Sequence, residues 1–264
     1  MMPISIPALL LSSWIMSALL MLWAWCFQRT RHNAAIVDIA WYLSFALVAV
    51  GYAVATTGDP NRRLLVAIMA GTWGLRLAGY LYLDRILDKS EDARYQRIRR
   101  WFGKRAQGYF FLLFQVEALA IPVFSLPLLV LMQNTRLDFS LWEWAGVVLW
   151  MIALAGEWQA DRQLVAFRAK PENQGKVCRE GLWRYSRHPN YFFESLHWWA
   201  YVLMAIGLPY AWATVVAPIG MTVTLLWITG IPLAEAQALV TRGEEYREYQ
   251  RTTSAFIPWF PKNT

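Results

Sequence analysis

Apolar runs long enough to cross a lipid bilayer recur along almost the whole chain, and they limit its fold more than any other feature. The first run is "ISIPALLLSSWIMSALLMLWAWCF", which is too long for a signal-peptide core and is expected to be a retained transmembrane helix. The chain is 57% hydrophobic and only 16% charged, which is too apolar for an ordinary soluble domain. These features predict an all-α, polytopic membrane protein in which residues 1–264 form one domain.

Seven transmembrane helices can be drawn from the apolar runs. They are expected at residues 4–27, 35–56, 63–85, 108–132, 141–163, 194–208 and 210–233. The sixth is short and ends at Gly207-Leu208-Pro209, so the last two form a tight hairpin. Pro122 and Pro127 are expected to kink the fourth.

Basic residues gather on one side of this arrangement. Of the 25 Lys and Arg residues, 21 follow the first, third, fifth or seventh helix. The positive-inside rule therefore places the N-terminus outside and the C-terminus in the cytoplasm. The net charge of +7 is then mostly a signal of topology, and no nucleic-acid partner is expected. Within this basic side, "DKSEDARYQRIRRWFGKRAQG" (88–108) is predicted to be a loop and an interfacial helix, as solvated surface rather than a ligand site.

Ionisable residues occur inside the predicted helices, where they are costly and mark functional sites by default. They are Asp38, Arg76, Glu117, Glu157, Asp161, Glu194 and Glu235. Most fall near cytoplasmic helix ends, which predicts a polar cavity open to the cytosol. Glu157 and Asp161 share one helix face, and so do Asn190 and Glu194. A purely structural alternative pairs Arg76 with Asp38 or Glu117 to hold helices together.

Two cytoplasmic segments, "GLWRYSRHPNYFFES" (181–195) and "GEEYREYQRTTSAFIPWFP" (243–261), are rich in Tyr, Arg and amide groups. Together they are predicted to close over a phosphate-bearing cofactor, since Arg binds phosphate bidentately and aromatic faces suit a flat ring. Alone, each is also typical of an interfacial aromatic belt, and Asn190 is typical of a helix N-cap. No Gly-rich phosphate loop, nucleophile motif or metal-ligand spacing is present, and Cys26 and Cys178 lie far apart, so no metal is expected.

At this point the residues resemble a known family. "GLWRYSRHPNYFFE" and "SAFIPWFP", with "NAAIVDIAWYLSF" and "GTWGLRLAGYLYLDR", closely resemble the bacterial steroid 5-alpha-reductase-like family of integral membrane proteins. The similarity covers nearly the whole chain. It implies a seven-helix fold in the bacterial inner (plasma) membrane, with NADPH bound in a cavity open to the cytoplasm. It also implies hydride transfer to an activated carbon–carbon double bond of a steroid-like or other unsaturated lipid that enters from the bilayer.

The resemblance places the cofactor-binding half at about residues 157–258. Carried over by position, the cofactor residues are Arg76, Asp161, Arg168, Tyr185, Arg187, His188, Asn190, Glu194 and Tyr246. Arg168 and Arg187 would hold phosphates, and Asn190 and Glu194 the nicotinamide or ribose.

The substrate half departs from the steroid-reductase pattern. Asp38 stands where a Glu polarises the substrate, preceded by Val37 instead of Gln, and Trp73 falls near the expected Tyr. The candidate catalytic residues are therefore Asp38, Tyr80 and Glu117, and Tyr42 is a further possible source of a hydroxyl. This favours an NADPH-dependent lipid reductase more than a steroid reductase.

Two other functions remain open. A membrane S-adenosylmethionine-dependent methyltransferase of the isoprenylcysteine or phospholipid type also carries an Arg-His-Pro-x-Tyr motif and a "eeYreY…P" tail, although a single Glu235 replaces its usual Glu-Glu pair. A seven-helix transporter or receptor is the non-enzyme alternative, but no inverted repeat is evident. A monomer surrounded by membrane lipids is expected in each case, and the sequence does not name the substrate.

Overall fold

The structure is a computed structural model that describes residues 4–262, and these contain helices but no strand. The all-α prediction is therefore confirmed for the described residues. The chain divides into two compact units. The first comprises the chain up to Phe139 together with Gly207–Val216, and the second comprises Ser140–Ile206 and the chain from Ala217 onward. The prediction of one domain stays a prediction.

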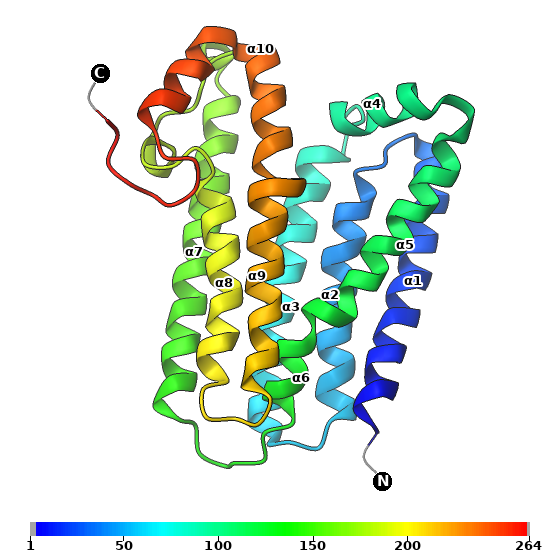
Figure 1. Ribbon diagram of the computed structural model, residues 1–264. Coiled ribbons are helices and arrows are strands. Elements are labelled where there is room, and N and C mark those ends of the chain that lie inside the picture. The colour runs from blue at the N-terminus through cyan, green and yellow to red at the C-terminus, as the bar shows by residue number, and fades with distance from the viewer. Residues whose placement is uncertain (1–3, 263–264) are drawn as a thin grey trace. The chain divides into compact units, whose positions relative to one another are not determined.

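The first unit is a helical bundle (Figure 1). Its elements are α1 (Ile6–Arg31), α2 (Ile36–Ala55), α3 (Pro60–Arg85), α4 (Ala93–Phe102), η1 (Gly103–Arg105), α5 (Ala106–Phe124), α6 (Leu126–Met132) and η4 (Ala211–Val215). Helix α2 packs against both α1 and α3, and α5 packs along α1. The predicted fourth helix is divided at Ser125: Pro122 lies inside α5, and Pro127 lies in the first turn of α6. The expected kink is thus confirmed.

Aromatic side chains fill the core between α2 and α3. Trp73 is fully buried, and the rings of Trp41, Tyr42 and Phe45 lie 5.1 to 6.3 Å from it, at nearly right angles. Edge-to-face packing of this kind is favourable beyond the area it buries. Trp73, which stands near the position of the family's Tyr, is therefore part of the packing of this unit.

The second unit contains the elements that position the candidate site. They are α7 (Leu141–Arg168), η2 (Pro171–Asn173), η3 (Gly181–Arg184), α8 (Pro189–Met204), α9 (Val216–Val223, in this unit from Ala217), the π-helical stretch η5 (Thr224–Ile228) and α10 (Ile231–Thr252). Helices α7 and α8 are antiparallel and pack along each other (Figure 1). A capping box of Ser140 and Glu143 begins α7.

Helix boundaries in this unit differ from the sequence-based ones in two places. Helix α8 begins at Pro189, five residues earlier than expected, because proline is well suited to the first helical position. Its N-cap residue is His188, so the alternative of Asn190 as the N-cap is wrong. The predicted last span is broken: η5 ends at Ile228, and α10 starts afresh at Ile231.

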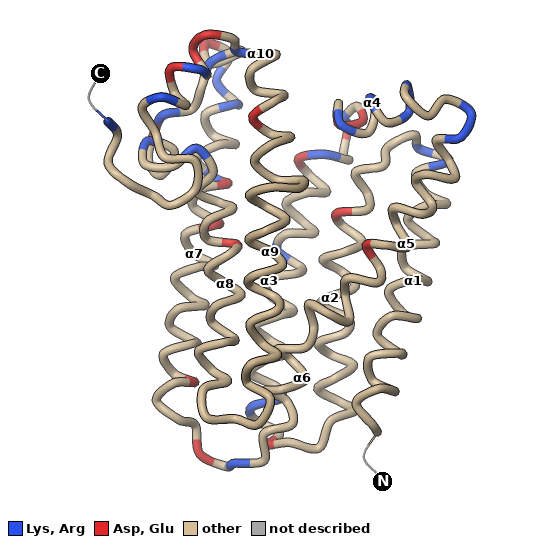
Figure 2. The backbone as a smooth tube through the Cα atoms, viewed as in Figure 1, with Lys and Arg blue, Asp and Glu red and all other residues tan. Residues whose placement is uncertain are grey.

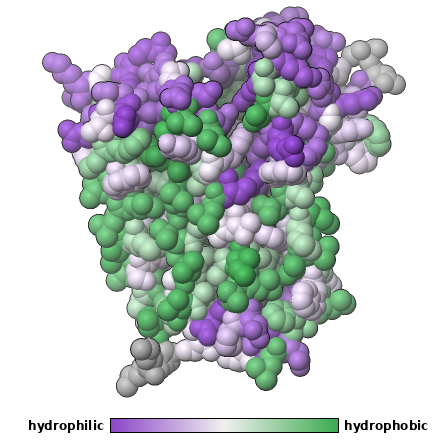
Figure 3. All heavy atoms as spheres, turned by 180° about the vertical axis from the view of Figure 1, so that it is seen from behind, coloured by the Kyte–Doolittle hydropathy of each residue, from purple (hydrophilic) through white to green (hydrophobic). Residues whose placement is uncertain are grey.

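Among the described residues, five helical stretches are long and apolar enough to cross a membrane. They are Ile6–Arg31, Ile36–Ala55, Pro60–Arg85, Ala93–Met132 and Ala211–Thr252. Helix α8 has only 16 residues, and α7 carries charges in its last turns. On the face drawn in Figure 3, apolar side chains cover the middle stretches of the helices, and polar residues gather at helix ends. The protein is therefore an integral membrane protein, while the count of seven spans and their orientation stay predictions.

The close approach of α7 and α8 gives a first testable prediction. A Cβ at Gly146 would lie 2.3 Å from Cγ of Met204 and 2.7 Å from the carbonyl oxygen of Ala200. Because that carbonyl belongs to the backbone, Gly146→Ala should lower the free energy of unfolding by about 1 to 3 kcal/mol. The thermal unfolding midpoint in detergent measures this. The control is Gly71→Ala in α3, where a Cβ meets open space and no loss is expected; equal losses in the two variants would contradict the tight packing.

Candidate functional site

Polar residues of α7 and α8 face each other in two layers. Nδ2 of Asn190 donates a hydrogen bond to Oδ1 of Asp161 at 3.3 Å. Glu157 lies one turn before Asp161, and Glu194 one turn after Asn190, so antiparallel packing brings them to the same level. The three carboxylate residues are 2 to 6% exposed. We call Glu157, Asp161, Asn190 and Glu194 together the carboxylate layers.

The carboxylate layers consist mainly of hydrogen-bond acceptors. The amide nitrogen of Asn190 is directed to Asp161, while its Oδ1 is buried and accepts no hydrogen bond from the described residues. A carboxylate accepts up to four hydrogen bonds and donates none. A ligand bound beside these residues would therefore need to offer positive charge or hydrogen-bond donors.

A second polar cluster forms around Glu235, in the second turn of α10. Its Oε1 accepts hydrogen bonds from Nε of Arg187 at 2.6 Å and from the hydroxyl of Tyr246 at 3.4 Å, and lies 3.2 Å from Nε2 of His188. Its Oε2 accepts from Nε2 of Gln250 at 2.6 Å. The side chains of Arg187 and Glu235 are 9% and 13% exposed, so their charges compensate each other in a largely dry environment. We call this group the Glu235 cluster.

Burial also determines the protonation state of His188. Desolvation lowers the pKa of its imidazole below the ordinary value, although the hydrogen bond to Glu235 opposes that shift. His188 is therefore held in its neutral form, with Nε2–H donating to Glu235. Its ring stacks on Tyr191, with the centroids 5.3 Å apart.

The C-terminal segment is bound along the stretch that enters α8. The backbone N–H of Arg187 donates to the carbonyl of Ser254 at 2.8 Å, and that of Trp259 to the carbonyl of Tyr185 at 2.9 Å. The hydroxyl of Ser186 donates to the carbonyl of Phe256 at 2.8 Å. The two predicted cytoplasmic segments are thus brought together (Figure 1). Figure 2 shows basic residues gathered in this region of the second unit.

Two backbone features direct α10 into the Glu235 cluster. The break after η5 restarts the helix at Ile231, one turn before Glu235. Gly243 then bends the helix with a φ of +55°, a conformation that favours glycine, and Tyr246 and Gln250 follow the bend. The position of Glu235 therefore depends on two departures from a continuous helix.

The other predicted cofactor residues are less closely associated with these clusters. Tyr185 contributes its carbonyl to the bound tail and packs its ring edgewise on Phe260. Arg168 is exposed in the last turn of α7. Arg76 belongs to α3 of the first unit, and so does not share a unit with the other eight.

The predicted catalytic residues all lie in the first unit. Asp38 forms an ion pair with Arg85, lies 3.8 Å from Arg94, and accepts a hydrogen bond from the Tyr95 hydroxyl at 3.3 Å. These contacts give Asp38 a structural role, because they join α2 to α3 and α4. Tyr80 is half-buried in α3, and Glu117 is half-buried in α5. Their catalytic roles stay predictions.

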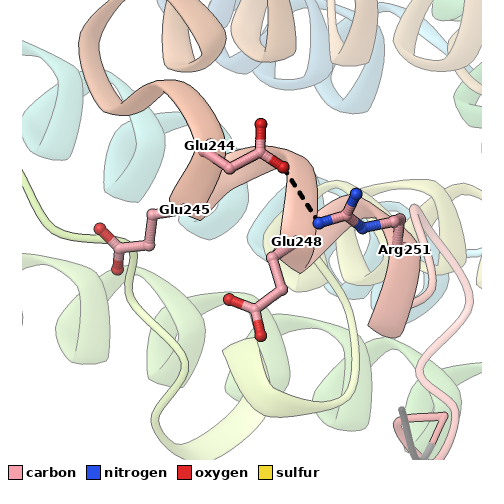
Figure 4. A pocket seen from close by; sticks show the side chains of 4 residues that line it. All are labelled: Glu244, Glu245, Glu248 and Arg251. Carbon is pink, nitrogen blue, oxygen red and sulfur yellow. Dashed lines mark hydrogen bonds and ion pairs between the residues drawn. The ribbon is translucent and has the colours of Figure 1, made fainter.

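An open hollow lies elsewhere on the second unit, over the last turns of α10 (Figure 4). Glu244, Glu245, Glu248 and Arg251 line it, and Arg251 pairs with Glu244 at 3.0 Å. No predicted site residue lines this hollow. Among residues 4–262, no group of three His, Cys, Asp or Glu side chains is placed to hold a metal ion.

Sequence reasoning singled out Glu235 as a buried charge but did not include it among the cofactor residues. Its partners lie 47 and 48 positions away in the chain, at His188 and Arg187. Two features of the sequence could have indicated its role. Glu235 is a charged residue at the end of an apolar run, and an Arg-His pair that could bind it occurs in the segment 181–195.

Comparison with known proteins identifies the family. A profile described as "Protein of unknown function (DUF1295)" matches residues 24–253. The chain belongs to this family. It is a membrane family linked to steroid 5-alpha-reductase-like proteins, which supports the resemblance seen in the sequence at the level of the family.

Two curated proteins are similar to this chain at 24 to 26% identity. An uncharacterized protein of Schizosaccharomyces pombe is 26% identical over 192 residues, which cover 64% of this chain and 54% of that protein. The chain therefore matches about half the length of this relative. Methanethiol S-methyltransferase of Mycobacterium tuberculosis is 24% identical over 265 residues, which cover 89% of this chain and 99% of that protein. No solved structure matches the chain.

The Glu235 cluster gives the second testable prediction. Arg187→Met would leave the Glu235 carboxylate largely buried without its cation, so the free energy of unfolding should fall by about 3 to 5 kcal/mol. Arg247→Met is the control, because its ion pair with Glu244 is exposed and its loss should change little. Denaturant unfolding in detergent measures both. The assignment fails if the two variants unfold at the same denaturant concentration.

Proposed function

We propose that this chain is a membrane methyltransferase that uses S-adenosylmethionine, with the carboxylate layers of the second unit as the cofactor-binding residues. The observation that carries the proposal is the similarity to methanethiol S-methyltransferase, which extends over 89% of this chain and 99% of that protein. An alignment of this extent relates the two chains from end to end. It supports a shared reaction class more than a shared substrate.

The charges of the second unit support the same cofactor. S-adenosylmethionine carries a sulfonium and an ammonium group, both positive. Glu157, Asp161 and Glu194 are buried acidic side chains, which supply negative charge when they are ionised, and Oδ1 of Asn190 supplies a further acceptor. Opposite charges attract most strongly where water is excluded, so these residues fit a cationic ligand.

The same region is less suited to NADPH. That cofactor carries phosphates that require free guanidinium groups. Arg187, which the sequence assigned to phosphate, donates instead to Glu235 and to the carbonyls of Gln250 and Thr253. A phosphate would have to displace these bonds before Arg187 could bind it.

The chemistry of the proposal is methyl transfer to a thiol or a similar soft nucleophile that reaches the site from the bilayer. When bound, S-adenosylmethionine supplies an activated methyl group: the acceptor sulfur gains the methyl and releases a proton, and the sulfonium is left as a neutral thioether. Asp161, Asn190 and Glu194 would hold and orient the cofactor. The Glu235 cluster would hold the tail over the entry to α8. The distribution of basic residues supports a site on the cytoplasmic side of the inner membrane.

An NADPH-dependent lipid reductase is the second candidate, and the resemblance to the reductase family supports it. Arg168, which is exposed in the last turn of α7, is the cation that this candidate would place near a phosphate. The substrate would then be an unsaturated lipid.

The third testable prediction separates the two cofactors. S-adenosylmethionine and S-adenosylhomocysteine should each raise the thermal unfolding midpoint of the purified chain by several degrees at saturating concentration, because a ligand that binds only the folded state stabilises it. NADPH at the same concentration should leave the midpoint unchanged. Transfer of a labelled methyl group from S-adenosylmethionine to a small alkyl thiol should follow. Stabilisation by NADPH alone would reverse the proposal in favour of the reductase.

The fourth testable prediction concerns the carboxylate layers. Asp161→Asn and Asn190→Leu should each weaken S-adenosylmethionine binding by about tenfold to a hundredfold, since each removes a charged or buried hydrogen-bonding group. Equilibrium binding of the labelled cofactor measures this. Gln159→Ala is the control, because Gln159 is exposed on the same helix. If Asp161→Asn bound the cofactor with unchanged affinity, the carboxylate layers would not be the cofactor-binding site. That result would not decide which cofactor the chain binds.

A further inference from the structure

Helix α4 of the first unit lies crosswise at the end of α5 (Figure 1). The turn η1 joins the two helices, and Gly103 bends the chain there with a φ of +50°. The stretch Ala93–Met132, which is long and apolar enough to cross a membrane, begins with the charged helix α4, and the bend at Gly103 separates α4 from the apolar helices α5 and α6. The end of such an apolar stretch is the level at which lipid headgroups meet water.

One face of α4 is fixed to the rest of the first unit. Tyr95 is buried, and its hydroxyl donates to Asp38. Nε of Arg99 donates to Oε2 of Glu91 at 2.7 Å, and its Nη2 donates to Oε1 of Gln28 in α1 at 2.8 Å. Charged side chains on this face are thus compensated within the unit, and the helix is held in a defined orientation.

The other face of α4 and η1 carries positive charge. Its exposed basic residues are Arg97, Arg100, Lys104 and Arg105. None of the four has an ion pair or side-chain hydrogen bond with another described residue, unlike Arg94 and Arg99 on the fixed face. Figure 2 shows this concentration of basic residues on α4 and on the turn that follows. We call these four residues the α4 basic face.

A tryptophan projects from the same side. Trp101 is 84% exposed and lies four positions after Arg97, so the two side chains share one face of α4. Tryptophan concentrates where the bilayer meets water, because its ring is apolar and its N–H is polar. Arg29 and Arg31, exposed at the end of α1, add charge beside the helix, since Gln28 of that helix bonds Arg99.

We propose that the α4 basic face is a binding surface for acidic phospholipid headgroups, with Trp101 inserted at the level of the glycerol backbone. The charge of this surface favours an anionic ligand, because four cations without partners lie close to a tryptophan at one end of a membrane-crossing stretch. Each cation held near an acidic bilayer strengthens binding by about fivefold, and the effect weakens as salt screens it. This surface is separate from the proposed methyltransferase site and does not depend on that function.

The test uses the full chain in nanodiscs that contain phosphatidylcholine and phosphatidylglycerol, with brominated acyl chains on one lipid at a time. Bromine quenches tryptophan fluorescence only at contact. The signal of Trp101 is the difference between the wild type and Trp101→Phe. Brominated phosphatidylglycerol should quench this signal at least threefold more than brominated phosphatidylcholine does at equal mole fraction, and high salt should remove the preference.

A variant that replaces all four residues of the α4 basic face by Gln should lose the preference, while the fixed face keeps its contacts. The matched control replaces Arg247, Arg251 and Lys262 by Gln and should retain it. Equal quenching by the two lipids in the wild type, or a preference that survives in the four-residue variant, would overturn the proposal. So would tight binding of a labelled single-stranded RNA to phosphatidylcholine nanodiscs that the four-residue variant loses, since the surface would then serve nucleic acid.

Discussion

The ion pair between Arg187 and Glu235 is the interaction on which the rest of the candidate site depends. It joins the segment that enters α8 to the start of α10, and the same arginine binds the carbonyls of Gln250 and Thr253 at the far end of that helix. A buried ion pair adds little net stability, because desolvation offsets attraction. What it provides is position: neither partner can move without leaving a charge uncompensated. The tail therefore has one preferred register along residues 185–188.

Much of the fold follows from the length and composition of the apolar runs. The first three helices were predicted within a few residues, and the division at Ser125 followed from two prolines. The break between η5 and α10 was not predicted, because a π-helical stretch changes the hydrogen-bond pattern and not the hydropathy. The early start of α8 was signalled by Pro189, but the apolar run that follows gave more weight to a later start.

The candidate site could be predicted in part. The shared face of Glu157 and Asp161, and that of Asn190 and Glu194, follow from four-residue spacing. That the two faces meet is seen only in the structure, through the bond between Asn190 and Asp161. Partners that are distant in the chain could not be derived in this way. Asp38 pairs with Arg85 and not with Arg76 as the structural alternative supposed, and Glu235 pairs with Arg187, because tertiary packing decides which of several charges meet.

The Arg-His-Pro segment explains why two enzyme classes were difficult to separate from sequence. Here its arginine binds Glu235 and the tail, its histidine is the N-cap residue of α8, and its proline is the first residue of that helix. All three roles build the scaffold. A motif with such structural roles can occur both in enzymes that bind a dinucleotide and in enzymes that bind a sulfonium cofactor. Under the proposed function, selection would come from other groups that the scaffold presents, which in the second unit are Glu157, Asp161 and Glu194. The proposal therefore expects a change in these residues, more than a change in the motif, to convert one cofactor preference into the other.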